Sequence, residues 1–321
     1  MKDYLRVADL SANGLERALS LSLEAKLVPH RWQNLLRGET VVLYFSKPST
    51  RTRISFETAV VRLGGSPVVV GPNELQLGRG ETIEDTARVI SRFAKAFVIR
   101  TFADEDVHRF AAAATIPVIN ALTDAHHPCQ ALADLLTLRE RFGRLAGLKV
   151  AYLGDGNNVA HSLMEACALA GVDIAVATPP GFEPATEVFE TAERLGLETG
   201  SEVWTTHDPL LAVAGADVVY TDVWLSMGMP DDERASRAAA LSGYRVTDAI
   251  MAEAQPHAVF MHCLPAHRGD EVAADVIDGP QSVVFDQAEN RLHTATGVLV
   301  GLLSHEIESA HGADLREAVA S

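Results

Sequence analysis

The sequence predicts an α/β fold with two doubly wound parallel-sheet domains. The chain has 321 residues, 47% of them hydrophobic, which is enough to bury two cores of ordinary size. Short runs rich in β-branched residues alternate with segments of helical periodicity, and this alternation is typical of parallel sheets flanked by helices. A polar helix stops and a new strand opens near FGRLAG (142–147), so we expect the domain boundary there.

Helices are expected between nearly all the strands. Ser11 is placed to cap the first helix, a polar helix runs from about Ala131 to the boundary, and an amphipathic helix starts at Arg291 with no strand after it. The strands are expected at VVLYF (41–45), SPVVVG (66–71), AFVIR (96–100), PVIN (117–120), LKVAYLG (148–154), DIAVAT (173–178), DVVYTDV (217–223), AVFMHCL (258–264) and SVVF (282–285).

Composition excludes several classes of protein. The net charge of −16 argues against a nucleic-acid or anionic-membrane partner, and no apolar run approaches the ~20 residues of a membrane span. The first ten residues interleave charged and apolar side chains, unlike a signal peptide. Three cysteines without a CxxC pair suit a reducing cytoplasm, and we expect no zinc site.

Unusual polar residues follow the predicted strands. Ligands of open parallel sheets bind beyond the carboxyl ends of the strands, so we expect a site there, in a cleft between the two domains. The residues concerned are Ser49 to Arg53, Arg100, His127, Gln130, Asp155 to Asn158, Asp222, Ser226, His262 and Cys263.

The stretch STRTR (49–53) predicts an anion site. Ser49 can cap the helix, and the amide groups of the first turn point at an incoming anion. Arg51 is the better phosphate clamp, because Arg53 is spaced to pair with Glu57 at i,i+4. The alternative is a capped surface helix with one ion pair.

The stretch GDGNN (154–158) does not complete a dinucleotide-binding motif. The third glycine of GxGxxG would fall on Val159, and the next strand ends in Ala177 and Thr178 without an acid for a ribose. Asn157 and Asn158 are better interpreted as amide groups for a polar ligand. A dinucleotide-dependent oxidoreductase and a non-catalytic binding subunit are therefore the weaker alternatives from other classes.

Three further residues allow two interpretations each. His127 precedes Pro128 and belongs either to a site or to a helix-capping turn. Asp222 can hold an ammonium group or cap the next helix, and Cys263 can line a site or be a buried structural thiol.

With these motifs in view, the chain resembles the aspartate/ornithine carbamoyltransferase family. The resemblance rests on FSKPSTRTR (45–53), QLGRGET (76–82), Arg100, HHPCQ (126–130) and ENR (289–291). The ornithine branch is indicated by DVWLSMG (222–228), by HCLP (262–265), and by the absence of lysine from residues 71–85.

The resemblance implies transfer of the carbamoyl group from carbamoyl phosphate to the side-chain amine of L-ornithine, giving L-citrulline and phosphate in arginine metabolism. It implies a carbamoyl-phosphate domain at 1–143, with a C-terminal helix at about 291–321 crossing back to it, and an ornithine domain at 144–290. It also implies a homotrimer, or a multiple of trimers, and no cofactor or metal. Another amine acceptor, such as putrescine or an acylated ornithine, is the alternative within the family.

The resemblance also implies roles for individual residues. Arg100, His127, Asp222 and Cys263 are expected to be catalytic. Carbamoyl phosphate is expected to contact Ser49, Thr50, Arg51, Thr52, Gln76, Arg100, His127, Gln130, Cys263, Leu264 and Arg291, with Gln76 reaching the site of a neighbouring subunit. Ornithine is expected to contact Asn158, Asp222, Ser226 and Met227.

Overall fold

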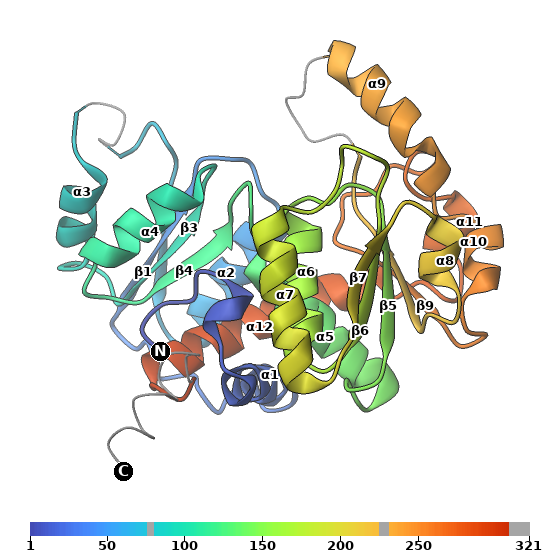
Figure 1. Cartoon of the computed structure of the whole chain (residues 1–321). Helices are drawn as coiled ribbons and strands as arrows, with labels where there is room; N and C mark the ends of the chain where they lie inside the picture. The colour runs from blue at the N-terminus through green and yellow to red at the C-terminus, as the bar shows by residue number, and fades with distance from the viewer. Residues whose placement is uncertain (76–79, 225–230, 308–321) are drawn as a thin grey trace, which may run out of the picture. The chain divides into compact units, whose positions relative to one another are not determined.

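A computed structural model describes residues 1–75, 80–224 and 231–307, and they form two compact units (Figure 1). The first unit comprises Met1–Leu136 and the residues from Glu289 onward, and the second comprises Thr137–Ala288. Each contains one parallel sheet with interleaved helices, so the predicted fold class is confirmed.

The first unit has a four-stranded sheet in the order β2-β1-β3-β4, and every pair of neighbouring strands is parallel. The chain passes from β1 to β2 on one side and from β3 to β4 on the other side. The topological switch point therefore lies between the carboxyl ends of β1 and β3. Its elements are η1 (Val7–Asp9), α1 (Ala12–Leu27), β1 (Thr40–Phe45), α2 (Arg51–Arg62), β2 (Ser66–Val70), α3 (Ile83–Ile90), β3 (Ala96–Arg100), α4 (Asp104–Ala113), β4 (Val118–Leu122) and α5 (Pro128–Phe142), the last of which continues into the second unit.

The second unit has a five-stranded parallel sheet in the order β7-β6-β5-β8-β9. By the same rule its switch point lies between β5 and β8. The elements are β5 (Lys149–Leu153), α6 (Asn158–Leu169), β6 (Asp173–Ala177), α7 (Thr186–Thr199), β7 (Val203–Thr206), α8 (Pro209–Val213), β8 (Val218–Thr221), α9 (Asp231–Leu241), η2 (Ser242–Tyr244), α10 (Asp248–Glu253), β9 (Val259–His262), α11 (Ala274–Ile277) and the start of α12 (Val284–Leu303).

The central strands are apolar on both faces because helices cover each sheet from both sides. Four consecutive residues of β1 and all five of β4 are buried, which explains the continuous apolar runs in the sequence. In the first unit Phe97 of β3 stacks on Phe110 of α4 with ring centroids 3.9 Å apart. Such packing fixes each strand, and therefore the loop at its carboxyl end.

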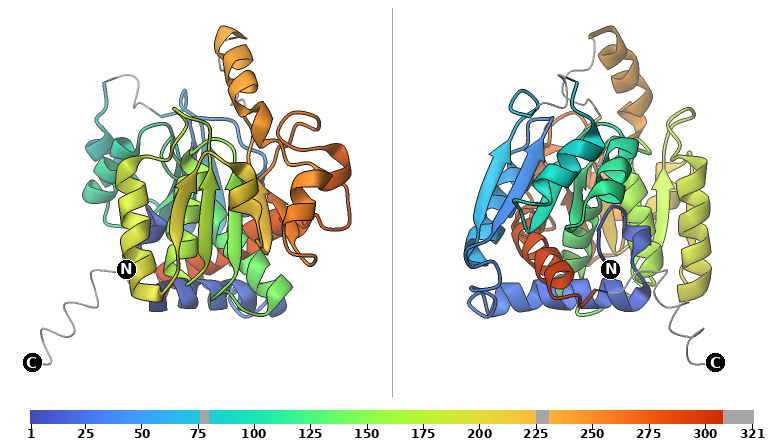
Figure 2. Two further views of the ribbon diagram at one scale, coloured as in Figure 1. Left: turned by 45° about the vertical axis from the view of Figure 1, so that its right-hand side comes forward. Right: turned by 90° about the vertical axis from the view of Figure 1, so that its left-hand side faces the viewer.

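Helix α12 belongs mainly to the first unit and packs on α1 (Figures 1 and 2). A Cβ at Gly297 of α12 would lie 2.3 Å from Ser22 Oγ and 2.8 Å from Ser22 Cα, so only glycine permits this approach. The close packing fixes the helix that carries Arg291.

Two predicted elements need correction, and one strand was not predicted. SVVF (282–285) is not a strand, because Ser282 makes only an isolated bridge to Phe260 and α12 begins at Val284, not at Arg291. The two valines suggested a strand, but the helical periodicity that continues through residue 303 prevails. Strand β7 was missed, because its four residues are mostly half-exposed and lack an apolar run. The N-cap at Ser11 is confirmed, since its side chain accepts a hydrogen bond from Gly14 N at 2.9 Å.

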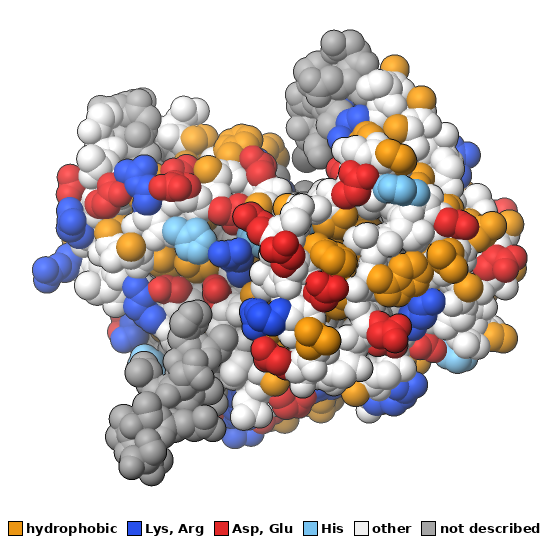
Figure 3. Space-filling view, in the orientation of Figure 1, with side chains coloured by type: hydrophobic (Ala, Val, Ile, Leu, Met, Phe, Trp, Pro, Cys, Tyr) orange, Lys and Arg blue, Asp and Glu red, His pale blue; other side chains and the backbone are white. Residues whose placement is uncertain are grey.

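Acidic and basic side chains are interspersed on the face drawn in Figure 3. Among the residues that the structure describes, no helix combines the length and the apolar composition that crossing a bilayer requires.

Candidate active site

The stretch STRTR leads into α2 just after β1. The predicted cap by Ser49 is wrong, because the N-cap residue is Thr50, whose backbone is already helical and whose side chain makes no capping hydrogen bond. The amide groups of the first turn lack carbonyl partners within a helix, so this end suits an anion. Arg53 is exposed and its Nε lies 2.6 Å from Glu57 Oε1, which confirms the predicted ion pair.

The buried guanidinium group of Arg291 contacts two other predicted residues of the first unit, Gln130 and Thr52. Arg291 Nη1 donates to Gln130 Oε1 at 2.6 Å and Arg291 Nη2 donates to Thr52 Oγ1 at 3.0 Å. Gln130 Nε2 in turn donates to Asp134 Oδ1 at 2.8 Å. All four side chains are buried, so α12 is joined to the first turns of α2 and α5 by charge-assisted hydrogen bonds.

His127 lies in a strongly positive environment within the same unit. Burial lowers its pKa well below the ordinary value, and the charges of Arg291, Arg100 and Arg51 lower it further. The imidazole therefore stays neutral at neutral pH and keeps one N–H as a donor. Arg100 ends β3, where its backbone oxygen accepts hydrogen bonds from Ser46 N at 2.9 Å and Ser46 Oγ at 3.2 Å. These bonds join the carboxyl ends of β1 and β3 at the switch point.

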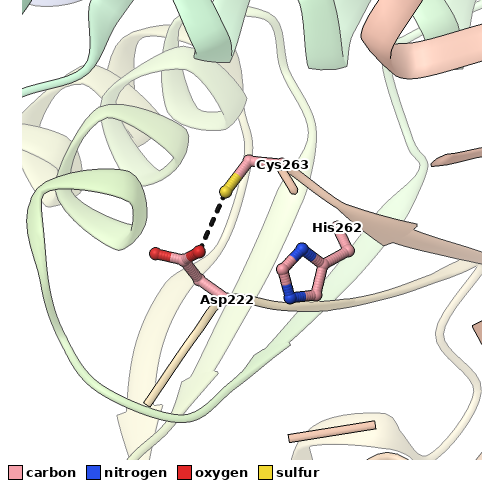
Figure 4. Close-up of side chains that lie close together, drawn as sticks. All are labelled: Asp222, His262 and Cys263. Atoms are coloured by element: carbon pink, nitrogen blue, oxygen red, sulfur yellow. Dashed lines mark hydrogen bonds between the residues drawn. The ribbon is translucent and has the colours of Figure 1, made fainter. Parts of the chain in front are cut away.

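Asp222 and Cys263 meet in the second unit (Figure 4). Asp222 directly follows β8, Cys263 directly follows β9, and Cys263 Sγ donates to Asp222 Oδ1 at 2.9 Å. The carboxylate is buried and the thiol is half-buried. Sequence spacing alone did not pair them, because 41 residues separate them.

Asn157, which the sequence suggested as an amide group for a polar ligand, contacts Asp222 and the first turn of α6. Its Nδ2 donates to Asp222 Oδ2 at 2.9 Å, and its Oδ1 caps α6 by accepting from Val159 N and Ala160 N at 3.0 and 3.2 Å. Because the Asn157 side chain is held in place by the cap of α6, it also orients the Asp222 carboxylate to which it donates. Asn158, which was predicted to bind ornithine, is the first residue of α6 and is half-buried.

A buried network supports the loop that carries Cys263 and Leu264. Leu264 has a φ of 57°, a left-handed conformation that costs a non-glycine residue ~1–2 kcal/mol. Its amide donates to His262 Nδ1 at 2.8 Å, and His262 Nε2 lies 3.3 Å from Glu271 Oε1. His262 N donates to Gln287 Oε1 at 2.9 Å. No motif in the sequence indicates that Glu271 or Gln287 supports this loop.

One ligand atom each from Asp222, His262 and Cys263 lie within 4.8 Å of one another, which is a set that a soft divalent ion can use. Both ring nitrogens of His262 already face other groups, Leu264 N and Glu271, so a metal here would displace one of them. Gln76, Ser226 and Met227, three of the predicted site residues, lie outside the described residues.

We predict that His127 makes the fold sensitive to mild acid. Because its folded pKa is lowered from 6.5, the unfolded chain takes up a proton first as the pH falls, and stability present above 6.5 is lost below it. The loss approaches about 1.4 kcal/mol per pH unit. Urea unfolding from about pH 7 down to about pH 5 should show a smaller loss for His127→Asn than for the wild type. His108→Asn, at an exposed position of the same unit, should keep the wild-type slope; equal slopes for all three proteins would contradict the assignment.

We also predict that Asp222 suppresses the reactivity of Cys263. Cys129 and Cys167 are buried, and burial raises the pKa of the Cys129 thiol to about 12, so iodoacetamide should modify Cys263 first. The carboxylate opposes negative charge on the sulfur, so Asp222→Asn should speed alkylation severalfold, whereas Asp248→Asn, an exposed carboxylate of the same unit, should not. Peptide mapping by mass spectrometry measures this, and an unchanged or slower rate in Asp222→Asn would count against the contact.

Family models match both parts of the chain. Residues 2–140 match the carbamoyl-P binding domain of aspartate/ornithine carbamoyltransferases, and residues 146–302 match the Asp/Orn binding domain.

Whole-chain relatives agree with these matches. An ornithine carbamoyltransferase of Parafrankia sp. is 60% identical over 84% of both chains, and one of Bacillus subtilis is 50% identical over 94% of both. The solved ornithine carbamoyltransferase of Pyrococcus furiosus has a TM-score of 0.91 and 48% identity, covering 96% of this chain and 98% of its own. The chain belongs to the aspartate/ornithine carbamoyltransferase family.

Proposed function

We propose that this protein transfers the carbamoyl group from carbamoyl phosphate to the side-chain amine of L-ornithine, giving L-citrulline and phosphate in arginine metabolism. The observation that carries the proposal is the hydrogen-bonded Asp222–Cys263 pair at the ends of β8 and β9, because a carboxylate there can attract an ammonium group. The names and the high identity of the relatives support the choice of ornithine.

The first unit contains the residues that we propose to bind carbamoyl phosphate through its phosphate group. Ser49, Thr50, Arg51 and Thr52 hold the phosphate through hydroxyl groups, a guanidinium and the open end of α2. Two of the donors of Arg291 are already used on Thr52 and Gln130, so this residue mainly orients those side chains and adds positive potential.

Three donors stabilise the oxyanion that forms on the carbonyl oxygen. They are Thr52, Arg100 and His127, the last acting as a neutral N–H donor because its pKa is lowered. Loss of one donor of this kind costs about 3 kcal/mol of transition-state stabilisation.

The second unit contains the residues that we propose to bind the amine. An ornithine amine has an ordinary pKa near ~10.4 and arrives as an ammonium, which Asp222 attracts and helps to deprotonate. The freed amine attacks the carbonyl carbon, a C–N bond forms, and the bond between that carbon and the phosphate oxygen breaks. The ammonium proton passes to Asp222, the second N–H proton passes to the leaving phosphate, and the arginines stabilise that phosphate. Because Cys263 is a thiol that donates to Asp222, it can take part only by relaying a proton to that carboxylate. Asp222, Ser226 and Met227 position ornithine, Asn158 binds its α-amino and carboxylate end, and Leu264 contributes to binding carbamoyl phosphate.

The reaction proceeds without an enzyme nucleophile or a metal. We place the protein in the cytoplasm, in keeping with its three cysteines, none of which forms a disulfide. We place the domain boundary at the turn after α5, between the two family matches.

We further propose a homotrimer in which Gln76 reaches a neighbouring site. Exposed Ile54 and Val61 on α2 support an interface, and light scattering that gave the 34.4-kDa mass of one chain would contradict it.

Arg51 and Arg53 form a matched pair for testing the phosphate assignment. Arg51→Ala is expected to raise the KM for carbamoyl phosphate about tenfold or more, since a charge-assisted hydrogen bond contributes ~1.5–3 kcal/mol. Arg53→Ala removes only the surface ion pair with Glu57 and should leave this KM within about twofold of wild type.

Initial-rate kinetics with both substrates measure the effect, and circular dichroism confirms that both variants are folded. Normal affinity for carbamoyl phosphate in Arg51→Ala would rule out this residue as the clamp.

A further inference from the structure

A second cluster of metal-ligating side chains lies in the second unit, in the loop that follows Cys263. We propose that His267, Asp270 and Glu271 bind one divalent transition-metal ion such as Zn²⁺. One ligand atom from each residue lies within 4.8 Å of the others. The site is separate from the reacting groups, and the proposal does not rest on the proposed function.

Glu271 provides the observation that points to an ion. Its side chain is fully buried, yet its Oε2 has no hydrogen-bond partner among the described residues. The other oxygen, Oε1, accepts from His267 N at 2.5 Å and lies 3.3 Å from His262 Nε2. A buried carboxylate oxygen without a partner is costly and calls for an ion or a water molecule to satisfy it.

The geometry favours an ion over a water molecule, because two further ligand atoms, from His267 and Asp270, lie near Glu271 Oε2. Oε2 lies 3.8 Å from His267 Nδ1, with a carboxylate oxygen of Asp270 within the same small cluster. A tetrahedral zinc ion with bonds of about 2.1 Å holds its ligand atoms roughly 3.4 Å apart. His267 and Asp270 are both exposed, so their side chains can move by the remaining distance, which is about 0.4 Å for the Oε2–Nδ1 pair and at most about 1.4 Å for any pair in the cluster.

Neighbouring positive charges do not neutralise this cluster. Arg268 is paired with Asp278 through Nε–Oδ2 and Nη2–Oδ1 contacts of 2.8 and 2.6 Å, and Arg245 Nε donates to the backbone oxygen of Asp270 at 2.6 Å. Two carboxylates and an imidazole therefore remain for a cation. This mixed nitrogen and oxygen set suits Zn²⁺ or Co²⁺ better than Mg²⁺ or Ca²⁺, which take oxygen ligands.

Occupancy of the site would leave the existing network intact. The ion uses Oε2, while Oε1 continues to face His262 and His267 N. Because His262 Nδ1 accepts from Leu264 N, a bound ion would stiffen the support of the loop that carries Cys263. The expected consequence is a higher thermal midpoint in the presence of metal.

Co²⁺ binding to the untagged full chain tests the proposal. Equilibrium dialysis should give one Co²⁺ per chain, with visible d–d absorption and no thiolate-to-cobalt charge-transfer band. Asp270→Asn and His267→Ala should each weaken binding about tenfold or more. Asp275→Asn, an exposed carboxylate on α11, is the control and should bind like wild type.

Cys263→Ser separates this site from the Asp222–His262–Cys263 cluster and should retain Co²⁺ binding. Loss of binding in Cys263→Ser, a thiolate charge-transfer band, or unchanged affinity in both Asp270→Asn and His267→Ala would overturn the proposal. So would no Co²⁺ binding to the wild type. Circular dichroism checks that each variant is folded, which is expected because both substituted side chains are exposed.

Discussion

The first unit depends most on the hydrogen bonds that the buried guanidinium group of Arg291 makes. A buried charge is costly unless it is paired, and here Thr52 and Gln130 accept its hydrogen bonds while Asp134 lies one bond further along the chain of contacts. Thr52 lies 239 residues away in the sequence and Gln130 lies 161 away, so the bonds hold α12 against the starts of α2 and α5. Those two helix starts are where the proposed anion binds.

Parallel-sheet topology explains why the candidate polar residues lie together at one end of each sheet. In the first unit the switch point lies between β1 and β3, and these strands lead into the STRTR segment and end at Arg100. In the second unit it lies between β5 and β8, and these strands are followed by Asn157 and Asp222. Each unit thus offers its polar groups where helix starts and loop amides converge. Positive groups dominate the set in the first unit, and a carboxylate lies at the centre of the set in the second.

The sequence predicted the buried strands well, because helices cover both faces of each sheet and leave continuous apolar runs. The prediction failed where there is no such apolar run, as in β7, which is short and half-exposed. It also failed at Val283 and Val284, because two adjacent valines are compatible with either a strand or a helix. In the site it identified the residue types but not their contacts. Asn157 is 65 residues from Asp222, and nothing in the local sequence shows that the capping amide also contacts this carboxylate. The hydrogen bond between Gln130 and Asp134 is one that their i,i+4 spacing does predict.

The identity of the amine acceptor tests the account most directly. Carbamoyl phosphate should be incubated with the enzyme and, separately, with L-ornithine, putrescine, an α-N-acylated ornithine or L-aspartate, and the products identified by mass spectrometry. The account predicts rapid formation of L-citrulline from L-ornithine, with the carbamoyl group on the side-chain nitrogen, and little product from the other three amines. Faster carbamoylation of putrescine, acylated ornithine or aspartate than of L-ornithine would contradict it.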